Sequence, residues 1–399
     1  MSIKVLLGHN HYRTSAPSGE DTVCKNEFAL LERHNIKVIP FEKFNDNLDD
    51  STIRNKLSIA IDGAWSKNTY DELSQLIKET QPDIAHFHSI FPQISPSAYA
   101  ACKDNGVPVV QTLHNFRPIC PGALLMRNGK PCEDCIGTNL LPALKHRCYR
   151  GSLLATGAIV YQITRNRLTG TYNNLVDRYI CLTEFAKGRY IAAGFPAEKM
   201  TVKPNFLPSN NFIQSNSFPP YAVFVGRLTD EKGVWTLLNA WTHISDLPLK
   251  IIGDGKVRNE LEAYAIEHCL PVEFLGFRHN AEVLEIVGNA TMQIIPSECY
   301  EGFPMVVLEA YGLGVPVVAS RIGSLEEVVD EGVTGLKFKA GDPLDLSAKV
   351  NSLKENVLML NKMSSNAKKL YEEQYTADYN FKLLMSIYEN VIAESIGGR

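Results

Sequence analysis

The chain has 399 residues, more than one ordinary hydrophobic core holds, and this length fits two domains. Hydrophobic residues make up 45% and charged residues 21%, which is typical of a soluble globular protein, and no apolar run approaches the roughly 20 residues that span a bilayer. Nine cysteines, an odd number spread unevenly, argue against a secreted disulfide framework.

The net charge of −4 is distributed unevenly along the chain. Residues 117–178 hold nine basic and three acidic residues, so this stretch is locally positive. A basic patch attracts an anionic membrane surface or an anionic acceptor, although a solvated charged face is an equally good interpretation. No nucleic-acid partner is expected.

The N-terminal residues are predicted to begin a β-strand and not a signal peptide, because the apolar run Ile3–Gly8 is short and polar residues follow it. We therefore expect a cytoplasmic protein, either free or at the inner face of the membrane. Apolar, β-branched runs alternate with helix-like stretches through both halves. In the first half they are Ile3–Gly8, Ile36–Phe41, Asp83–His88, Val107–His114, Arg178–Thr183 and Met200–Pro204. In the second half they are Tyr221–Leu228, Leu249–Gly255, Val272–Phe277, Thr291–Ser297, Pro316–Ser320 and Gly335–Phe338.

This alternation predicts a parallel sheet covered by helices on both faces, and it occurs twice. We expect two doubly wound, Rossmann-like α/β domains, residues 1–205 and 206–374. A stretch rich in proline, serine and asparagine, residues 204–220, separates them. Residues 375–399 are predicted to form a helix whose apolar stripe must be buried, with the first domain as one candidate surface.

The most informative segment follows the apolar strand at Thr291–Ser297 and opens a helix, as Glu301-Gly302-Phe303-Pro304-Met305-Val306. Gly302 allows a close approach of the backbone to a ligand, and Pro304 suits the first helical turn. The free amides around Met305 and Val306 would form an anion site for a diphosphate.

Glu301 and Glu309 lie on either side of this turn, eight residues apart. Glu301 would sit in the loop at the reactive end of a ligand, and Glu309 would lie along the helix and accept hydrogen bonds from a sugar or ribose diol. A single such glutamate is usually a surface carboxylate. The position at a strand's carboxyl end, where open α/β sheets bind ligands, favours a functional site.

These residues, followed by Gly314-Val315-Pro316, resemble the signature of the retaining glycosyltransferases of family four, also called group 1, which have the GT-B fold. The resemblance covers almost the whole chain and implies two Rossmann-like domains facing across a cleft. Further similar segments are Pro17-Ser18-Gly19-Glu20, Gln111-Thr112-Leu113-His114-Asn115, Gly226–Gly233, Ile252–Gly255, Phe274–Phe277 and Gly332–Gly335. Their shared order and spacing carry the resemblance more than any single match.

The resemblance implies transfer from a nucleotide-diphosphate sugar to a saccharide or lipid-linked saccharide, with retention of anomeric configuration, in surface polysaccharide biosynthesis. Arg227 and Lys232 would neutralise the diphosphate and the leaving group, Glu301 would hold the transferred sugar, and His114 would face its anomeric carbon. Glu309 would hold the ribose. The other donor contacts implied are Gly19, Gly276, Phe277, Gly302, Phe303, Pro304, Met305 and Val306.

Two features depart from the family's most familiar pattern. Pro304 stands where many relatives have glycine, and Gly19 is a single glycine and not part of a pair. The family mechanism has the leaving diphosphate help to take the acceptor proton on the same face of the sugar. The chain has no Asp-x-Asp metal motif, and Arg227 with Lys232 can supply the positive charge, so no catalytic cofactor or metal is expected.

Four cysteines, Cys120, Cys132, Cys135 and Cys148, are spaced C-x11-C-x2-C-x12-C in a segment rich in Pro, Gly and Arg. A structural zinc site that braces this segment is one interpretation, and unligated thiols or a disulfide are the others. The apolar stretch Leu153–Ile163, flanked by arginines, is either a core helix of the first domain or an amphipathic helix that touches a membrane.

Two other functions compete with transfer. A nucleotide-sugar epimerase of the same fold would convert its ligand without an acceptor, and a non-catalytic nucleotide-sugar-binding protein would not need Glu301, Glu309, Arg227 and Lys232 together. A nicotinamide dehydrogenase is poorly supported, because Gly8-His9-Asn10-His11 lacks the G-x-G-x-x-G turn. The donor base, the sugar and the acceptor are not specified by the sequence.

Overall fold

In the computed structural model, residues 3–15, 18–49, 51–137, 139–208 and 220–397 are described. They form two compact units, each with its own parallel sheet. Unit 1 contains residues 1–124, 133–205 and 380–399, and unit 2 contains residues 125–132 and 206–379. The expected first domain, residues 1–205, differs from unit 1 at residues 125–132. Pro17 and the Ser/Asn-rich residues 209–217 of the expected linker lie outside the described residues.

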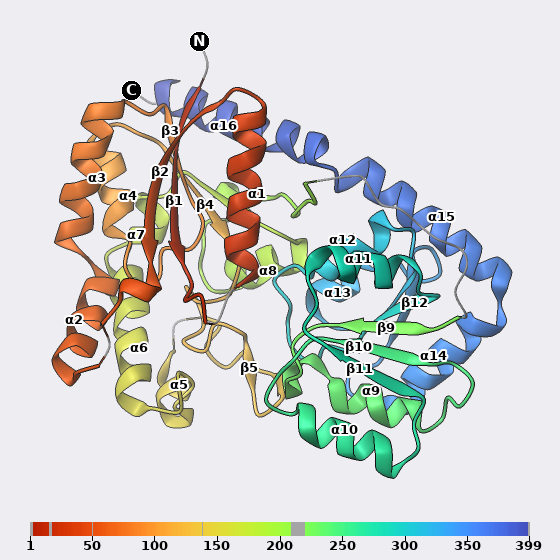
Figure 1. The fold of residues 1–399 in the computed structure, drawn as a ribbon. Coiled ribbons are helices and arrows are strands. Elements are labelled where there is room, and N and C mark those ends of the chain that lie inside the picture. The colour runs from red at the N-terminus through yellow and green to blue at the C-terminus, as the bar shows by residue number, and fades with distance from the viewer. Residues whose placement is uncertain (1–2, 16–17, 50, 138, 209–219, 398–399) are drawn as a thin grey trace. The chain divides into compact units, whose positions relative to one another are not determined.

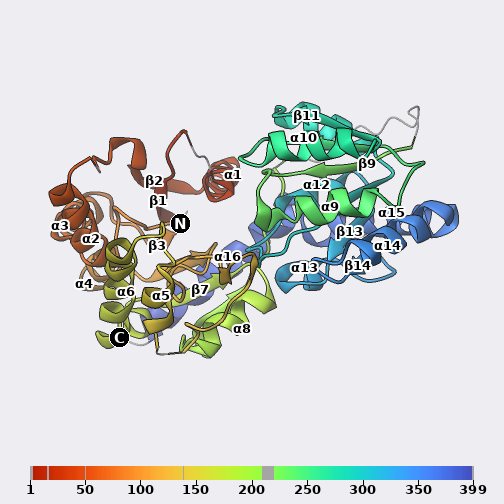
Figure 2. The same cartoon turned by 90° about the horizontal axis from the view of Figure 1, so that it is seen from below.

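Unit 1 has a six-stranded parallel sheet in the order β2-β1-β3-β4-β7-β8, with helices on both faces (Figures 1 and 2). Its strands are β1 (Lys4–His11), β2 (Lys37–Phe44), β3 (Ile84–Phe87), β4 (Val109–Leu113), β7 (Arg178–Cys181) and β8 (Met200–Val202). Its helices are α1 (Gly19–Arg33), α2 (Ile53–Ala64), α3 (Lys67–Thr80), α4 (Ser97–Asp104), α5 (Leu141–His146), α6 (Leu153–Leu168), α7 (Thr171–Asn174) and α8 (Glu184–Ala192).

Unit 2 has a second six-stranded parallel sheet, in the order β11-β10-β9-β12-β13-β14. Its strands are β9 (Ala222–Val225), β10 (Leu249–Ile252), β11 (Val272–Gly276), β12 (Met292–Ile295), β13 (Val317–Ser320) and β14 (Gly335–Phe338). Its helices are α9 (Val234–Trp241), α10 (Arg258–Glu267), α11 (Asn280–Gly288), α12 (Met305–Gly312), α13 (Gly323–Val328), α14 (Pro343–Glu355) and α15 (Val357–Gln374). The short hairpin β5 (Met126–Arg127) and β6 (Lys130–Pro131) is grouped with this unit.

Each of the twelve apolar runs expected to form a strand overlaps with one. The inner strands of both sheets are largely buried on both faces, whereas the edge strands β2 and β11 also carry exposed residues. Most strands end one to three residues before the expected limit, whereas β1 and β2 continue three residues beyond it. Helix α1 begins at a capping box, in which the Ser18 side chain accepts from the amide of Glu20 and Asp21 returns a contact to the amide of Ser18.

The last helix, α16 (Ala377–Gly397), adds its apolar stripe to the core of unit 1 from Asn380 onward. Leu384, Tyr388 and Val391 are buried there against Val5 and Leu31. Tyr388 also hydrogen-bonds a histidine of β3, which fastens the helix to the sheet with a polar contact. Within the described ranges, no helix is long and apolar enough to cross a membrane.

Candidate active site

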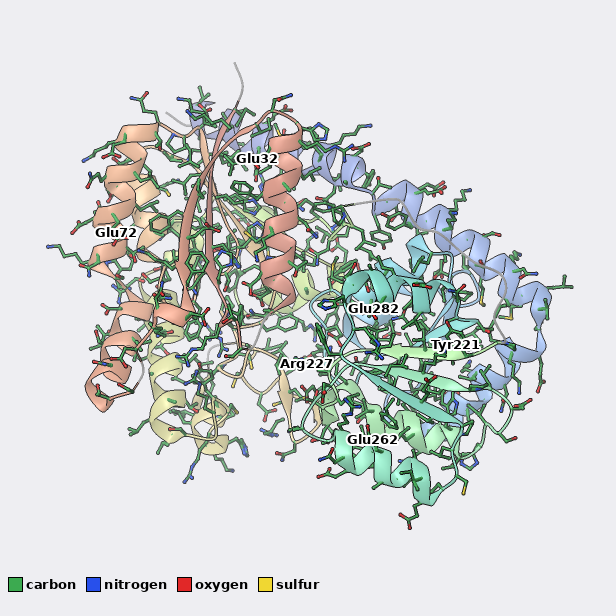
Figure 3. The ribbon with its side chains drawn as sticks, viewed as in Figure 1. Glu32, Glu72, Tyr221, Arg227, Glu262 and Glu282 are labelled. Carbon is green, nitrogen blue, oxygen red and sulfur yellow. The ribbon has the colours of Figure 1, made fainter. Side chains whose placement is uncertain are left out.

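The carboxyl edge of the sheet in unit 2 gathers most of the expected site residues. The chain leaves β9 toward β10 and β11 on one side and returns to β12, β13 and β14 on the other, so β9 and β12 flank the point where the strand order reverses. Ligands of open α/β sheets bind at this point. The loop after β9 carries Arg227 (Figure 3) and Lys232. The loop after β12 carries Glu301.

Glycines allow these loops to approach each other closely. Gly233 has φ +67° at the start of α9, and a Cβ atom there would lie 1.8 Å from the Pro296 carbonyl oxygen. A Cβ atom on Gly255 would lie 2.2 Å from the Leu228 carbonyl oxygen. The amide of Glu298 donates to the Glu231 carbonyl at 2.9 Å, which ties the two site loops together. Only glycine fits such close backbone contacts.

Lys232 and Glu301 form the central ion pair of this edge. The ammonium Nζ lies 2.6 Å from Oε1 of Glu301, and the hydroxyl of Ser297 donates to the same oxygen at 2.7 Å. Burial alone would raise the pKa of Glu301, but Lys232, Ser297 and the nearby Arg227 lower it below its usual value. Burial opposes the charge of Lys232 too, and Glu301 more than offsets it, so the pKa of Lys232 is raised. Both groups are therefore charged near neutral pH.

Arg227 is exposed at the end of β9, and no acidic side chain of the described residues forms an ion pair with it. Its charge reaches Glu301 and the buried thiol of Cys299, so it belongs to the same electrostatic cluster. An unpaired guanidinium next to a paired ammonium suits a diphosphate, which needs two positive groups.

Helix α12 points its N-terminus toward this cluster. Pro304 was expected in the first turn of the helix. It is instead the N-cap, and Met305 is the first helical residue. Within the described chain, the amides of Met305 and Val306 have no hydrogen-bond acceptor, whereas that of Val307 bonds to the Pro304 carbonyl at 3.0 Å. Two open amides at a helix start can bind an anion, and a diphosphate at this place stays a prediction.

Glu309 lies one turn further along α12 and is partly buried. Its only hydrogen-bond partner among the described residues is the Asn280 amide, whose nitrogen is 3.4 Å from Oε1. Burial raises the pKa of Glu309 to about 7, and the weak contact with Asn280 offsets little of this. The two glutamates therefore have opposite pKa shifts, because only Glu301 has a cation beside it.

The remaining donor contacts that the resemblance implies differ in what they can offer. The Phe303 side chain is buried against Tyr375 at 6.1 Å between ring centroids, so only its backbone can face a ligand. The Gly302 carbonyl accepts from the hydroxyl of Ser324. The Gly276 carbonyl accepts from the Gly253 amide at 2.9 Å, whereas the ring of Phe277 is 71% exposed. Base recognition at these residues stays a prediction.

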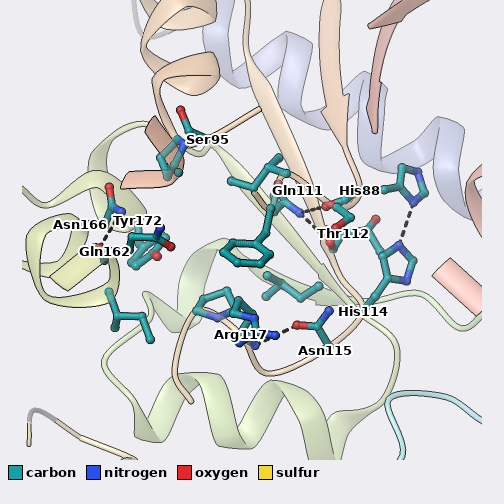
Figure 4. A pocket seen from close by; sticks show the side chains of 18 of the residues that line it. His88, Ser95, Gln111, Thr112, His114, Asn115, Arg117, Gln162, Asn166 and Tyr172 are labelled. Atoms are coloured by element: carbon teal, nitrogen blue, oxygen red, sulfur yellow. Dashed lines mark hydrogen bonds between the residues drawn. The ribbon is translucent and has the colours of Figure 1, made fainter. Parts of the chain in front are cut away.

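Unit 1 holds the other expected residues around a pocket of its own (Figure 4). His114, directly after β4, lines this pocket with Glu20, Asn115 and Arg117. The Asn115 amide donates to Glu20 at 2.6 Å. Gly19 is the first residue of α1, and a Cβ atom there would meet nothing within 4 Å, so the space beside it is open.

A buried polar network behind His114 was not predicted. Nδ1 of His88 lies 2.9 Å from Nε2 of His114, and behind it are Glu27, His86 and Lys203. The pattern His86-Phe87-His88 places two histidines on one face at the carboxyl end of a strand, and it could have indicated a polar cluster there. Its partners come from distant parts of the chain and leave no local pattern.

The four cysteines are not gathered into a single cluster of ligand atoms among the described residues. Cys120, Cys135 and Cys148 belong to unit 1 and Cys132 to unit 2. Among the described residues, every set of three ligand atoms within 4.8 Å of one another consists of histidines and carboxylates. The arrangement therefore gives the zinc hypothesis no support, and it stays a prediction.

Two doubly wound parallel sheets in one chain are the architecture of the GT-B fold. Two solved structures share this fold over nearly all of both chains. Anabaena Alr3699/HepE in complex with UDP has a TM-score of 0.68 at 18% identity, covering 97% of this chain and 100% of its own. Sucrose-phosphate synthase from Thermosynechococcus elongatus has a TM-score of 0.70 at 15% identity, covering 98% and 100%.

The chain belongs to the glycosyl transferases group 1, whose family model matches residues 209–370. The model of Glycosyltransferase Family 4 matches residues 54–210. It is 30% identical to the uncharacterized glycosyltransferase MJ1178 of Methanocaldococcus jannaschii, over 81% of this chain and 80% of that protein. It is also 29% identical to the sulfoquinovosyl transferase SQD2 of Arabidopsis thaliana, over 69% of this chain and 51% of that protein.

Proposed function

We propose that this glycosyltransferase moves a sugar from a nucleotide-diphosphate sugar to a saccharide or lipid-linked saccharide, with retention of anomeric configuration, in surface polysaccharide biosynthesis. The observation that carries the proposal is the edge of unit 2, where Arg227, Lys232 and the open amides of Met305 and Val306 meet the charged carboxylate of Glu301. Cations and amides suit a diphosphate, and a carboxylate acceptor suits sugar hydroxyls.

The structure of a relative with ligand supports the donor class. HepE of Anabaena is bound to UDP-glucose in one of its structures, and it shares the fold of this chain. The loop after β9 and the start of α12 would hold the diphosphate here, and Glu309 the ribose. Charge on the leaving diphosphate would be stabilised by Arg227 and Lys232, and the diphosphate would help to take the acceptor proton on the same face of the sugar.

A thermal-shift panel of nucleotide sugars tests donor binding, because a ligand that binds the folded protein raises its melting temperature. The expected result is a shift with one sugar and base, lost in the double variant Arg227→Ala/Lys232→Ala. Glu372→Gln, an exposed carboxylate on α15 of the same unit, is the matched control. No shift with any nucleotide sugar, or an undiminished shift in the double variant, would contradict the proposal.

Nuclear magnetic resonance of the product tests the stereochemistry. Retention gives a new glycosidic bond with the anomeric configuration of the donor, and an inverted product would contradict it. Donor incubated without acceptor should stay unchanged or be slowly hydrolysed. A stable new nucleotide sugar would instead favour the epimerase.

We also propose that the surface of α5 and α6 touches an anionic membrane. Residues 141–168 contain five Lys and Arg residues and no acidic residue. One face of α6 is core, with Ile159 and Ile163 buried, while the other exposes Leu154 at 87% and Leu168 at 83%. Exposed leucines beside basic residues are suited to contact with a bilayer that contains anionic lipids.

Flotation with phosphatidylglycerol vesicles tests this surface. The wild type should float with them and stay behind with neutral phosphatidylcholine vesicles. The variant Leu154→Ser/Leu168→Ser should lose flotation, whereas Leu358→Ser, an equally exposed leucine at 84% in unit 2, should keep it. Flotation that is unchanged in the double variant would contradict the assignment.

The structural zinc proposal is tested separately by metal analysis of purified protein. One zinc per chain, lost in Cys132→Ser/Cys135→Ser, would support it, and protein without zinc would remove it.

A further inference from the structure

A chain of buried polar side chains leads from the interior of unit 1 to His114. It starts at Glu27 on α1, which is 1% exposed. One carboxylate oxygen contacts Nδ1 of His86 at 3.0 Å and Nε2 of His88 at 3.1 Å, and the other contacts the Lys203 ammonium at 3.0 Å. Burial opposes the charge of Glu27, but Lys203 and the two histidines hold its pKa well below the usual value. Glu27 is thus a carboxylate that only accepts hydrogen bonds.

The carboxylate decides which nitrogen of His88 carries the proton. Since Glu27 can only accept, Nε2 of His88 must be the donor in their 3.1 Å contact. Burial lowers the pKa of His88 to about 4, although Glu27 raises it, so the ring is neutral near pH 7 and has one proton. Nδ1 of His88 is therefore a bare acceptor.

The same reasoning passes to the next ring. Nδ1 of His88 lies 2.9 Å from Nε2 of His114, so Nε2 of His114 must donate (Figure 4). Burial and the neighbouring His88 hold the pKa of His114 well below its usual value, so this ring is neutral too. Its single proton is on Nε2, and Nδ1 keeps a lone pair. If His88 instead donated from Nδ1 to His114, its Nε2 would carry no proton, and the lone pairs of Nε2 and of the Glu27 carboxylate would face each other.

Nδ1 of His114 is open to a ligand. His114 lines the pocket of unit 1, and no described residue is hydrogen-bonded to its Nδ1. Among the described residues, Nδ1 of His114 is not one of the fully buried side-chain atoms that lack a hydrogen-bond partner. Since it has no partner, it is accessible to solvent. A bare, accessible ring nitrogen accepts a hydrogen bond from a hydroxyl and has nothing to donate to a carboxylate.

We propose that Glu27 and His88 are positioning residues that hold His114 as the neutral Nε2–H tautomer, so that its Nδ1 accepts a hydrogen bond from a sugar hydroxyl and disfavours a carboxylate at that place. The inference rests on the proposed function for the identity of the ligand, but the tautomer itself is a property of the protein alone. Transfer of a neutral sugar is then favoured over transfer of a uronic acid whose carboxylate meets His114.

Other ionisable groups around the chain leave its direction unchanged. Nε2 of His9 in β1 bonds to Asp21 at 2.8 Å, and its Nδ1 accepts from the Ser89 amide, so both ring nitrogens of His9 have partners other than His88 and His114. His86 bonds to the Tyr388 hydroxyl and to Thr112. On the pocket side the charged groups are Glu20 and Arg117, which line the same pocket as His114.

A cation held by Glu27, His86 and His88 is the rival explanation of the same cluster, since their ligand atoms lie within 4.8 Å of one another. The Lys203 ammonium already neutralises Glu27, and Asn380 accepts from the same ammonium at 2.9 Å. A second positive charge beside a buried ammonium is unfavourable, so hydrogen bonding explains the cluster better than a metal does.

Long-range ¹H–¹⁵N spectra of ¹⁵N-histidine-labelled protein test the tautomer without any ligand. A protonated and a bare ring nitrogen resonate in separate regions, and the His114→Asn spectrum assigns the peaks. We expect His114 to show protonated Nε2 and bare Nδ1 throughout the range from about pH 5.5 to 8. A protonated Nδ1, or a His114 ring that gains a second proton in this range, would overturn the proposal.

Two substitutions of one residue separate positioning from packing. His88→Leu removes the acceptor of His114 while Glu27 keeps Lys203 and His86, so His114 should show mixed tautomers and protonate within the same pH range. His88→Gln has an amide that donates to Glu27 and a carbonyl that accepts from His114, and should restore the wild-type peaks. Identical His114 peaks in His88→Leu would refute the role of His88. If neither variant folds, the wild-type titration still decides.

Competition between UDP-glucose and UDP-glucuronate in the thermal-shift assay tests the consequence. The wild type should prefer UDP-glucose, and His88→Leu should narrow the ratio of their dissociation constants by about tenfold, because a protonated His114 can pair with the carboxylate. An unchanged ratio would refute the link to specificity. A protein that binds neither probe but shows the expected tautomer would refute the proposed function and leave the tautomer assignment intact.

Discussion

Glu309 offers the sharpest test of the site in unit 2, because its environment favours the neutral acid. Burial raises its pKa to about 7 in the folded protein, from an ordinary value of 4.5. The folded state therefore binds this proton up to about pH 7, while the unfolded chain releases it near pH 4.5. Between these values the folded state binds more protons, so stability falls as pH rises. The difference corresponds to about 3 kcal/mol at and above neutral pH.

Replacing the carboxyl by an amide removes this penalty. Glu309→Gln should stabilise the ligand-free protein at about pH 8 by up to roughly 3 kcal/mol, which is several degrees in melting temperature for a unit of this size. At about pH 5 the wild-type carboxyl is already protonated, so the variant and the wild type should melt within about one degree of each other. The measurement is thermal unfolding of both proteins across this range, with Glu372→Gln as the exposed control.

The same substitution should weaken donor binding. A carboxylate accepts hydrogen bonds from two ribose hydroxyls, whereas an amide offers one neutral acceptor, so we expect a dissociation constant about 10 to 100 times larger. Stability gained at high pH and affinity lost together would mark Glu309 as a residue that serves binding and not folding. An equal change in melting temperature at both pH values, or destabilisation at about pH 8, would refute the reasoning.

Lys232→Met should destabilise unit 2 by about 3 kcal/mol in urea unfolding, because it leaves the Glu301 carboxylate without its 2.6 Å partner. The double variant Lys232→Met/Glu301→Gln should recover most of this stability but none of the turnover. Gly233→Ala should lower the melting temperature by about 5 °C or more, since its Cβ would meet the Pro296 carbonyl, while Gly188→Ala, in open space, should not lower it. Turnover should survive a chelator, and activity that returns only with added Mn²⁺ or Mg²⁺ would contradict the role of Arg227 and Lys232.

The backbone of this protein is far more predictable from sequence than its side-chain pairs. A buried parallel strand needs a local run of apolar residues, so Thr291–Ser297 could be recognised as the strand that became Met292–Ile295. The helix start after Pro304 is equally local, because proline and the preceding glycine act within a few residues. Such features need no knowledge of the rest of the chain.

The hairpin of β5 and β6 was missed although a local signal existed. Asn128 and Gly129 both have positive φ, 52° and 74°, between two strands of two residues each. Asn-Gly between short strands favours a tight hairpin turn, but attention to the surrounding Pro, Gly and Cys residues led to a prediction of a long loop. The hydrogen bond from the Cys132 amide to the Leu125 carbonyl closes the hairpin.

The contacts behind His114 could not have been predicted by any local pattern. Glu27 and Lys203 are 176 residues apart, and His86 and Tyr388 are 302 apart. A buried lysine and a buried glutamate are each unfavourable alone, so their presence in the sequence indicates partners but not which ones. The topology of the sheet, which brings α1, β3 and α16 together, makes the choice.

The opposite pKa shifts of Glu301 and Glu309 give the two carboxylates of unit 2 different duties. Glu301 is charged at every physiological pH because Lys232 and Ser297 hold its oxygen, so it can accept from sugar hydroxyls as soon as a ligand arrives. Glu309 becomes a full acceptor only after it loses a proton, which happens near pH 7 in the free protein. Donor affinity should therefore rise from about pH 6 to 8 with Glu309 as the titrating group, and binding at about pH 6 should release a proton. Calorimetry in buffers of different ionisation enthalpy measures that proton. Its persistence in Glu309→Gln would place the titrating group elsewhere.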